Sequence, residues 1–433
     1  MLLSGWGRYP VLECNLVSPT GASFAHRDIK SVRRQVIPRG LGRSYGDSAL
    51  APHVISSAYL NHILDFNPDE GLVRCQSGVS LDDLIDVFLP QGWFLSVTPG
   101  TRFVSVGGAI ASDVHGKNHH IEGCFSQYIK SVKILLAGGD TVVCSREVNS
   151  ELFRATCGGM GLTGLILEAE LYLKAVKSSF IDETIIKTSN LKHTLELFEQ
   201  HKNSTYSVAW IDCLAKGENM GRSLLMLGEH SLQGGYAMPT RKKLSVPVDM
   251  PSILLNSYTV SAFNTLYYHR IRQPVIKHRI HYQPFFYPLD AIGNWNKLYG
   301  KNGFCQYQFV IPVESGVEGM TEVLNRIVES KRGSFLAVLK AFGEKNDNYL
   351  SFPVKGYTLA LDFKVDNQLF AFLEELDKVV LAYGGRVYLT KDARLDENTF
   401  KTSYDNWEAF VDIRKRYNAD SVFNSLQSMR LGI

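Results

Sequence analysis

Three glycine-rich stretches between residues 38 and 164 constrain the fold of this chain more than any other feature of its sequence. They are PRGLGRSYGD at 38–47, TPGTRFVSVGGAIASDVHGKNHH at 98–120 and CGGMGLTG at 157–164. Because glycine has no Cβ atom, main-chain N–H groups in such loops can approach a pyrophosphate closely, and several can converge on it. Any one stretch could be only a tight turn. Three together favour a site for a phosphate-containing cofactor.

The third stretch contains the formal dinucleotide fingerprint Gly159-x-Gly161-x-x-Gly164, but its context does not suit that function. A Rossmann fingerprint follows a strand and opens a helix. Here residues 151–156 are predicted to be helical, and residues 165–173 are predicted to be a strand. The order is reversed, so we expect no Rossmann site.

Length and composition predict a globular protein of two domains. The 433 residues exceed one ordinary domain, and 45% hydrophobic with 21% charged residues is typical of a chain with a packed core. A net charge of +3 gives no reason to expect a nucleic-acid partner. The 7 cysteines are scattered without a CxxC pair, which predicts a reducing, cytoplasmic environment. The first residues do not resemble a signal peptide, and no apolar stretch approaches the roughly 18 residues of a membrane span.

The secondary-structure signals change near residue 180. Before it, short strands alternate with glycine loops, and a strand followed by a helix is predicted over 71–89, with Ser80 as the N-cap. After it, residues 235–285 look irregular, mixing basic and aromatic side chains. The other elements expected in this part are helices at 189–202 and 368–385, and strands at 205–215 and 305–313.

Three histidines in HGKNHH, at positions 115, 119 and 120, raise the question of a metal site. Metal-binding histidines on one helix face stand four residues apart, and Gly116 and Asn118 disfavour a helix here. No cysteine or carboxylate cluster joins the histidines, so we expect no metal. Turn residues and a polar cofactor or substrate pocket remain the open alternatives.

In this order, the three stretches resemble the vanillyl-alcohol-oxidase-type FAD-binding family. The resemblance is closest to the flavin subunits of decaprenylphosphoryl-β-D-ribose 2′-epimerases, and it covers nearly the whole chain. The other motifs that carry it are LSGWGR at 3–8, YSVAWID at 206–212, FYPLDAIGNWN at 286–296, CQYQFVIP at 305–312, LSFPVKGY at 350–357, YLTKDAR at 388–394 and the terminal SMRLGI.

The resemblance implies an α+β fold with FAD as the cofactor. An FAD-binding domain over 1–178 would be completed by 386–433, and a substrate domain with an antiparallel sheet would span 179–385. Relatives that bind flavin covalently carry His in the first loop, where this chain has Arg43, so the implied FAD is non-covalent. The implied cofactor-binding residues, with the pyrophosphate against the glycines at 40, 42, 107 and 108, are Arg39, Gly40, Leu41, Gly42, Arg43, Ser44, Tyr45, Pro99, Gly100, Thr101, Gly107, Gly108, Ser112, His115, Gly116, Asn118, Gly161 and Gly164.

The family reaction is oxidation of the ribose 2′-hydroxyl of a polyprenyl-phosphoryl ribose to a ketone. A separate NAD(P)H-dependent short-chain reductase then completes the epimerisation to arabinose. The resemblance implies catalytic roles for Lys391, His115 and Tyr45. Lys391 would stabilise the negative charge of the reduced flavin, and the ordinary pKa of His115 suits proton transfer, but the sequence leaves the base open.

The implied substrate-binding residues are Lys117, Trp210, Tyr287, Gln306, Gln308, Ala360 and Lys391. Gln306 and Gln308 stand on one strand face, while Trp210 and Tyr287 could be pocket walls or ordinary core aromatics. Mycobacterial members carry Cys where this chain has Ala360. Covalent inhibitors that react with that thiol should therefore form no bond here.

Residues 239–282 mix cations with apolar side chains. This composition suits peripheral contact with the inner face of a plasma membrane, or simply a solvated loop. Two other functions remain open. The chain could be an aldonolactone or alditol oxidase of the same superfamily that uses free sugars and oxygen, or a flavin- or lipid-sugar-binding protein without catalysis.

Overall fold

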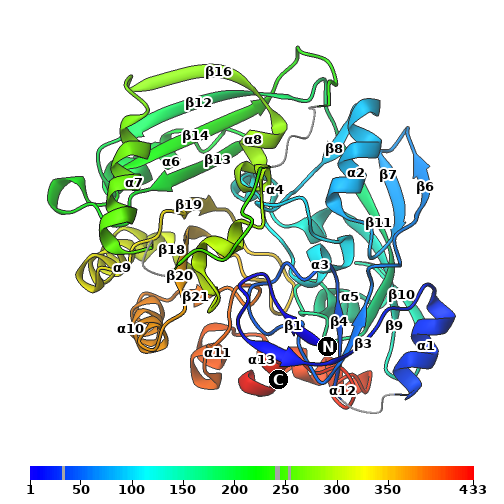
Figure 1. Cartoon of the computed structure of the whole chain (residues 1–433). Helices are drawn as coiled ribbons and strands as arrows, with labels where there is room; N and C mark the ends of the chain where they lie inside the picture. The colour runs from blue at the N-terminus through cyan, green and yellow to red at the C-terminus, as the bar shows by residue number, and fades with distance from the viewer. Residues whose placement is uncertain (32–34, 239–243, 252–254) are drawn as a thin grey trace.

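The computed structural model describes residues 1–31, 35–238, 244–251 and 255–433, and it confirms the α+β fold. Figure 1 shows two halves side by side, one built from the N-terminal blue and cyan segments and one around a large green-to-orange sheet. Strand β11 (Leu165–Ala175) ends the first run of strands, and β12 (Phe180–Thr188) begins the second.

The N-terminal half contains a parallel and an antiparallel sheet. The parallel sheet has the order β3 (Asn15–Val17), β5 (His53–Ser56), β4 (Val36–Arg39), so the first glycine stretch begins where β4 ends. The antiparallel sheet has the order β10-β9-β11-β7-β6, with β8 paired to β11. Its other strands are β6 (Ile63–Asn67), β7 (Leu72–Gln76), β8 (Trp93–Leu95), β9 (Ile129–Leu135) and β10 (Thr141–Cys144).

The local predictions for this half are confirmed. Helix α2 (Leu81–Phe88) begins with a capping box, in which Ser80 Oγ accepts from Asp83 N at 3.0 Å and Ser80 N donates to Asp83 Oδ2 at 3.1 Å. Helix α5 (Ser150–Thr156) precedes the third glycine stretch and β11 follows it, which is the reverse of a Rossmann unit. The remaining helices of this half are α1 (Ala22–Ser31), α3 (Val106–Ala111) and α4 (His119–Glu122).

The second half is built on an eight-stranded antiparallel sheet in the order β16-β12-β14-β13-β19-β20-β18-β21. Helices α6, α9 and α10 cover one face, where Leu195, Met320 and Leu376 belong to the same hydrophobic core. The other face is turned toward the N-terminal half and carries the polar residues described below. The new elements are β13 (Tyr206–Ile211), β14 (Ser223–His230), β16 (Val275–His281), β18 (Phe304–Pro312), β19 (Ala337–Phe342), β20 (Gly356–Lys364), β21 (Arg386–Val387), α6 (Leu191–Gln200), α9 (Gly316–Ser330) and α10 (Leu369–Ala382).

The prediction of an irregular segment at 235–285 is wrong for most of its described residues. Helix α7 (Ser257–His269) starts at a capping box of Asn256 with Thr259, and β16 is an edge strand paired with β12. An exposed helix and an edge strand need only a narrow apolar face. The cations and aromatic residues mixed into this segment therefore obscured the helical spacing of α7 and the alternation of β16. Residues 239–243 and 252–254 lie outside the described residues. The segment also contains β15 (Leu244–Ser245) and α8 (Tyr282–Phe286).

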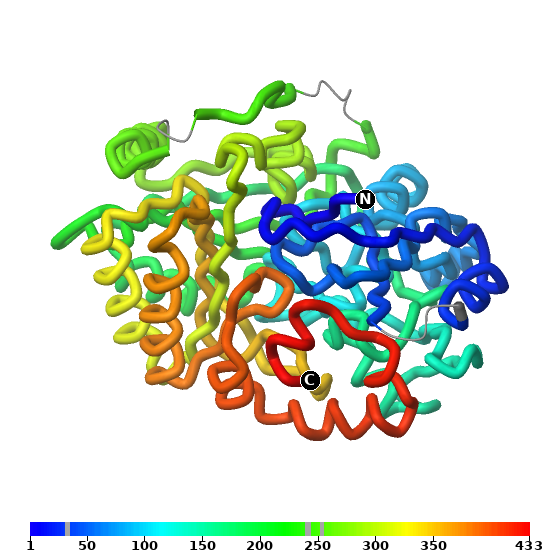
Figure 2. The backbone as a smooth tube through the Cα atoms, turned by 60° about the horizontal axis from the view of Figure 1, so that its bottom comes forward, coloured from blue at the N-terminus to red at the C-terminus, as the bar shows by residue number. Residues whose placement is uncertain are grey.

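The C-terminal helices α11 (Glu397–Ser403), α12 (Trp407–Arg416) and α13 (Leu426–Leu431) return to the N-terminal half. Asn424 N donates to Val36 O at 3.0 Å, and the buried Arg414 donates from Nε to Leu162 O at 3.2 Å. Figure 2 shows this red segment running beside the blue and cyan chain. The two small remaining strand pairings are β1 (Leu2–Ser4) with β2 (Val11–Glu13), and β15 with β17 (Ile292–Gly293).

All 7 cysteines are free, in line with their scattered spacing, and all are buried. Within the described ranges, none of the helices is both long and apolar enough to cross a bilayer.

Candidate active site

The first glycine stretch leaves a run of main-chain N–H groups without acceptors. Among the described residues, no hydrogen bond is donated by the amides from Gly40 to Ser44. Gly42 has φ +67°, a left-handed conformation that turns the loop and that a side chain would strain. A bend with several free N–H groups is suited to an anion such as a pyrophosphate.

The second stretch packs directly against this loop. A Cβ atom on Gly40 would stand 2.2 Å from Ser105 Oγ, which accepts from Gly108 N at 3.2 Å. Gly107 N donates to Ser77 O at 2.8 Å. The amides of Gly107 and Gly108 are therefore already paired, and these two glycines serve close packing.

The third stretch braces the end of α3. Gly158 N donates to Ile110 O at 3.0 Å and Met160 N to Ala111 O at 2.8 Å. A Cβ atom on Gly161, which has φ +79°, would stand 3.8 Å from the Pro38 ring at the start of the first loop. Gly164, with φ +153°, would place a Cβ atom 2.5 Å from Leu135 O, so the turn into β11 requires glycine.

Residues 98–102 join the two halves of the molecule. Tyr287 OH and Thr98 Oγ1 are 2.6 Å apart, and Asp290 accepts from Thr101 Oγ1 at 2.7 Å and from Arg102 N at 3.0 Å. The half-buried Pro99 and the exposed Gly100 lie in the same loop. Tyr287 is thus a buried residue of the junction, which favours packing over a pocket wall.

Lys391 and Tyr45 meet because the first loop packs on the turn that follows β21. Tyr45 N donates to Thr390 O at 3.1 Å, and Lys391 Nζ lies 4.0 Å from the centroid of the Tyr45 ring. A Cβ atom on Gly46 would stand 1.8 Å from Asp392 O, so the two main chains touch.

Ion pairs to two buried carboxylates hold that turn in place. Arg430 contacts Asp47 at 2.7 Å and Asp392 at 3.0 Å, tying the end of the first loop to the turn of Lys391. Burial would raise the pKa of Asp392, but Arg430 and Arg394 keep it below its ordinary value. The sequence prediction did not include Asp47, Asp392 or Arg430, although all three lie within the quoted motifs.

The polar face of the large sheet presents two glutamine amides, as predicted. Gln306 Nε2 donates to Asp362 Oδ1 at 2.7 Å and to Tyr45 OH at 3.4 Å. Gln308 Nε2 donates to Thr358 Oγ1 at 3.3 Å and to His115 Nε2 at 3.0 Å. Ala360 pairs with Gln308 across β18 and β20, so its side chain lies on the same face.

His115 is neutral. Burial, with Lys340, His119 and Lys391 nearby, holds its pKa well below the ordinary value. Because the Gln308 amide nitrogen donates, His115 accepts at Nε2 and carries its proton on Nδ1, which has no partner among the described residues. Three aromatic rings surround it, those of Phe342, Phe352 and Tyr388.

Lys391 is the one predicted catalytic residue whose charge changes near neutral pH. Burial lowers the pKa of Lys391 to about 8, against the opposing charge of Asp362. Burial also raises the pKa of Asp362 to about 7 and holds that of Tyr45 well above its ordinary value. The site therefore contains a titrating Lys–Asp pair beside a neutral phenol and a neutral imidazole.

The remaining predicted residues have partners of their own. Lys117 donates to Phe285 O and lies 4.3 Å from the centroid of the Phe285 ring. Trp210 is in a separate hydrophobic cluster, with Nε1 donating to Phe335 O at 3.1 Å. Asn118 braces Ser96 O at 2.8 Å, and Ser112 O accepts from Tyr388 OH at 2.9 Å.

Three further side chains complete the contacts of the predicted set. Arg39 Nη2 donates to Ser4 O at 2.6 Å, and the Arg43 guanidinium lies 4.1 Å from the centroid of the Trp6 ring. A Cβ atom on Gly116 would stand 2.5 Å from Asn118 Oδ1, so this glycine too permits close packing. Leu41 is exposed on the same loop as Arg43. These residues shape the first loop and its neighbours, while its amides remain free.

The histidines of HGKNHH serve different partners. His119 Nδ1 accepts from Gly343 N at 3.2 Å, and His120 Nε2 contacts Ser204 O at 2.8 Å, whereas His115 faces Gln308. His119 and His120 lie in α4, so the prediction against a helix here is wrong for these two residues. Asn118 occupies the N-cap position of that short helix, where its non-helical backbone is suitable.

FAD fits these residues. The free amides at 40–44 suit its pyrophosphate, the missing Cβ atom of Gly40 leaves room beside Ser105, and the unpartnered Nδ1 of His115 offers a buried donor.

Comparison with known proteins agrees with the geometry. Residues 23–145 match the model of the FAD binding domain family, and residues 296–430 match the D-arabinono-1,4-lactone oxidase family. The chain is 36% identical to the decaprenylphosphoryl-β-D-ribose oxidase of Mycolicibacterium smegmatis, over 99% of this chain and 97% of that protein.

Two further relatives mark the limits of the likeness. An uncharacterised protein of Streptomyces coelicolor is 30% identical over 82% of this chain and 100% of its own length. The L-gulonolactone oxidase of Bos taurus is 29% identical over 42% of this chain and 41% of that protein. The lactone oxidase likeness is thus partial, whereas the likeness to the mycobacterial oxidase spans both halves.

Proposed function

The chain belongs to the decaprenylphosphoryl-β-D-ribose oxidase family of FAD-dependent oxidoreductases, and we propose that it oxidises the 2′-hydroxyl of a polyprenyl-phosphoryl-β-D-ribose to the ketone. The observation that carries this proposal is the position of Lys391. Its ammonium touches Tyr45 of the first glycine loop and is electrostatically paired with Asp362 of the large sheet. A sugar bound to the sheet would therefore meet a flavin held by the loop.

FAD, when bound, supplies the acceptor for the hydride that leaves the sugar carbon, and the proton of the 2′-hydroxyl would pass to a basic side chain of the site. The amides from Gly40 to Ser44 would hold its pyrophosphate, and Lys391 would stabilise the negative charge that develops during oxidation. Gln306 and Gln308 orient the sugar hydroxyls, while neutral His115 and Tyr45 bind as hydrogen-bonding groups. On this proposal 1–178 and 386–433 hold the cofactor and 179–385 hold the substrate.

The flavin is non-covalent on this proposal. Arg43 stands in the first loop where covalent relatives carry His, and its guanidinium lies over the Trp6 ring. Acid precipitation of the purified protein should leave all of the FAD in the supernatant. Flavin that stays with the pellet would contradict this part of the proposal.

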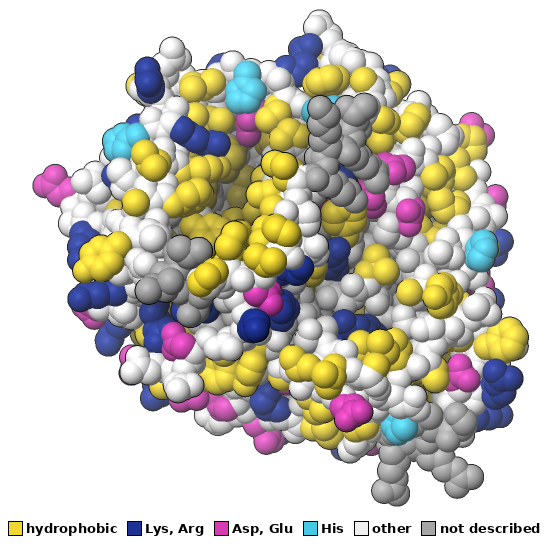
Figure 3. Space-filling model, viewed as in Figure 1, with side chains coloured by type: hydrophobic (Ala, Val, Ile, Leu, Met, Phe, Trp, Pro, Cys, Tyr) yellow, Lys and Arg dark blue, Asp and Glu magenta, His cyan; other side chains and the backbone are white. Residues whose placement is uncertain are grey.

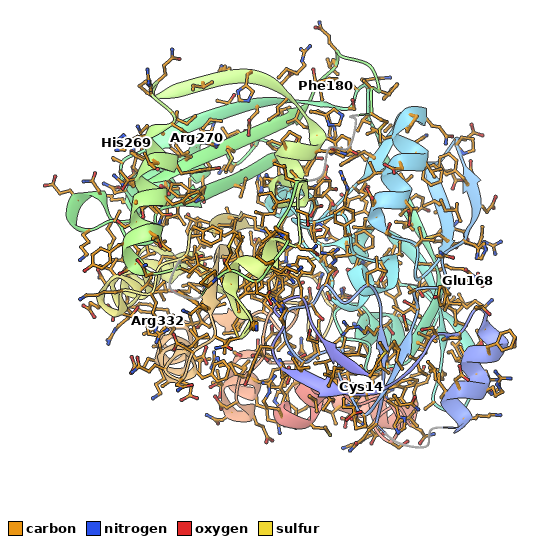
Figure 4. The ribbon with its side chains drawn as sticks, in the orientation of Figure 1. Cys14, Glu168, Phe180, His269, Arg270 and Arg332 are labelled. Atoms are coloured by element: carbon orange, nitrogen blue, oxygen red, sulfur yellow. The ribbon has the colours of Figure 1, made fainter. Side chains whose placement is uncertain are left out.

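The proposed function implies two partners for this protein, a reductase and a membrane surface. The 2′-ketone needs a separate NAD(P)H-dependent short-chain reductase to become the arabinose epimer. Helix α7 exposes Tyr258 and Leu266, 86% and 74% accessible, and His269 and Arg270 lie at the outer edge of this half in Figure 4. Apolar side chains beside cations suit a peripheral contact with the anionic inner face of the plasma membrane.

A lactone oxidase that uses free sugars and oxygen is the competing function, because residues 296–430 match that family. The test combines anaerobic and aerobic measurements on the yellow holoenzyme. A polyprenyl-phosphoryl ribose should bleach the flavin absorbance without oxygen, and oxygen should restore it only slowly. Bleaching by an aldonolactone with fast reoxidation, or no bleaching by the phosphoryl ribose, would reject the proposal.

A further inference from the structure

Three lysines converge on the polar face of the large sheet, and one of them lacks a carboxylate. Lys391 has Asp362 nearby, and Lys117 has Glu183. The charges that act on Lys340 are the like charges of Lys391 and Lys117. In the described part of the chain Lys340 forms no ion pair. Its ammonium lies 5.9 Å from the centroid of the Phe342 ring. A half-buried cation that lies near two other cations without a carboxylate would be stabilised by a bound anion.

Strand register fixes where Lys340 stands relative to the glutamines. Lys340 pairs with Thr358 on β20, and Thr358 Oγ1 accepts from Gln308, so all three share one face. On the other side of β19, Val338 pairs with Trp210 of β13.

Across the sheet the face therefore changes from neutral amides to a cation and then to apolar side chains. The apolar end continues through Trp210, Ile185 and Met226, which pack together. Figure 3 shows hydrophobic side chains gathered around a hollow over this part of the sheet. Sugar, phosphodiester and isoprenoid follow one another in the same order in a polyprenyl-phosphoryl ribose.

We propose that Lys340, with Lys117 beside it, binds the phosphodiester of the substrate and selects phosphorylated over neutral ribosides. This inference rests on the proposed function. A lysine ammonium is a compact charge that can donate to any of the phosphate oxygens. Binding the diester would supply the anion that Lys340 lacks and relieve its repulsion from Lys391 and Lys117. Lys340 is a specificity residue on this view, and Lys391 remains the residue of the oxidation itself.

The test compares two substrates that differ only in the phosphate, farnesyl-phosphoryl-β-D-ribose and farnesyl β-D-ribofuranoside. For each protein, kcat/KM is measured with a redox dye, and the ratio of the charged to the neutral substrate is taken. Lys340→Met should lower this ratio by about 30-fold or more, and Lys340→Arg should restore part of it. The control Lys378→Met, on the exposed side of α10, should keep the wild-type ratio.

Taking the ratio cancels losses of folding or of bound flavin. A ratio in Lys340→Met within threefold of wild type would overturn the inference while leaving the proposed function intact. If the wild-type holoenzyme oxidises neither compound, the proposed function fails and the inference fails with it. Farnesyl phosphate provides a second readout. It should inhibit the wild-type enzyme competitively and the Lys340→Met enzyme at least tenfold more weakly.

Discussion

The first glycine loop and the polar face of the large sheet present opposite kinds of binding surface. From Gly40 to Ser44 the free groups are main-chain amides, and the glycines matter for what they lack. On β18, β19 and β20 the groups that face the site are side chains, Gln306, Gln308 and Lys340 among them, and the backbone pairs between the strands. On the proposed function, the loop would recognise an anion through its backbone shape, whereas the sheet would recognise a sugar phosphate through the identity of its side chains.

This difference determines how each region should respond to mutation. A side chain added to the loop should remove the cofactor, because the amides lose their arrangement. A side chain changed on the sheet should leave the cofactor bound and alter the rate, the pH dependence or the specificity. Substitutions in the two regions should therefore have separable effects on bound flavin and on catalysis.

The largest effect is expected from Gly46→Ala. The added Cβ atom would overlap Asp392 O, 1.8 Å away, and neither main chain can yield without moving the loop or the turn of Lys391. We expect about 3 kcal/mol of destabilisation and at least a tenfold loss of bound FAD. The measurements are the ratio of flavin to protein absorbance and the melting temperature.

Gly138→Ala is the matched control, because a Cβ atom there meets only Asp140 Oδ2, at an ordinary 3.6 Å. It should keep its flavin and its melting temperature. Full flavin content in Gly46→Ala would mean that the contact between the loop and the Lys391 turn does not position the cofactor.

Lys391→Met should have the next largest effect, on the rate alone. Removing the charge that stabilises the transition state should slow flavin reduction about 100-fold, as loss of one preorganised electrostatic group does elsewhere. The bound flavin should be unchanged, because Lys391 contacts the loop through Tyr45 and not through its amides. Stopped-flow reduction under anaerobic conditions measures the rate, with Lys378→Met as the control. A loss of flavin without a change in the rate per flavin would show that Lys391 holds the cofactor and does not act on the rate.

The loop is a backbone site and the sheet face is a side-chain site, and this difference explains which parts of each could be predicted from the sequence. Glycines close together in sequence reveal a backbone site, so the first loop and the reversed order around residues 159–164 were readable. Lys340 and Asp362 escaped prediction, because their place beside Gln308 and Gln306 depends on the pairing of β19, β20 and β18. That register is a tertiary property, and each residue alone resembles an ordinary polar position in a strand. Helix α7 and strand β16 escaped for a local reason, their narrow apolar faces.

Asp362→Asn tests the charge coupling within the sheet face. Burial lowers the pKa of Lys391 to about 8, and Asp362 opposes that shift, so removing the carboxylate should lower this pKa further. If oxidation needs the protonated lysine, the rate of flavin reduction falls as the pH rises through about 8 in the wild type. In Asp362→Asn the fall should begin about one pH unit lower, which is roughly a tenfold loss at high pH.

The pH profile also shows whether Lys391 acts in its protonated or in its neutral form. A rate that rises with pH through the same range would identify the neutral lysine as a base, and the midpoint should still shift downward in Asp362→Asn. Asp366→Asn is the matched control, because that carboxylate is exposed and paired with Arg332. An unchanged midpoint in Asp362→Asn would show that Asp362 and Lys391 are not coupled.

The smallest effect on turnover is expected from Ala360→Cys, which adds one sulfur atom to the polar face. Turnover should stay within about threefold of wild type, because the change in volume is small. No native cysteine is more than 4% exposed, so iodoacetamide should label the wild type slowly. Ala360 is 9% exposed and lies on the polar face, so Ala360→Cys should gain one adduct by mass spectrometry, and substrate should protect it. Leu361→Cys, whose side chain points to the opposite face and is 0% exposed, is the control and should gain none. Labelling of position 361, or labelling of position 360 that substrate does not prevent, would show that the alternation of β20 does not place Ala360 against the sugar. The specificity assigned to side chains of this face would then have to come from elsewhere.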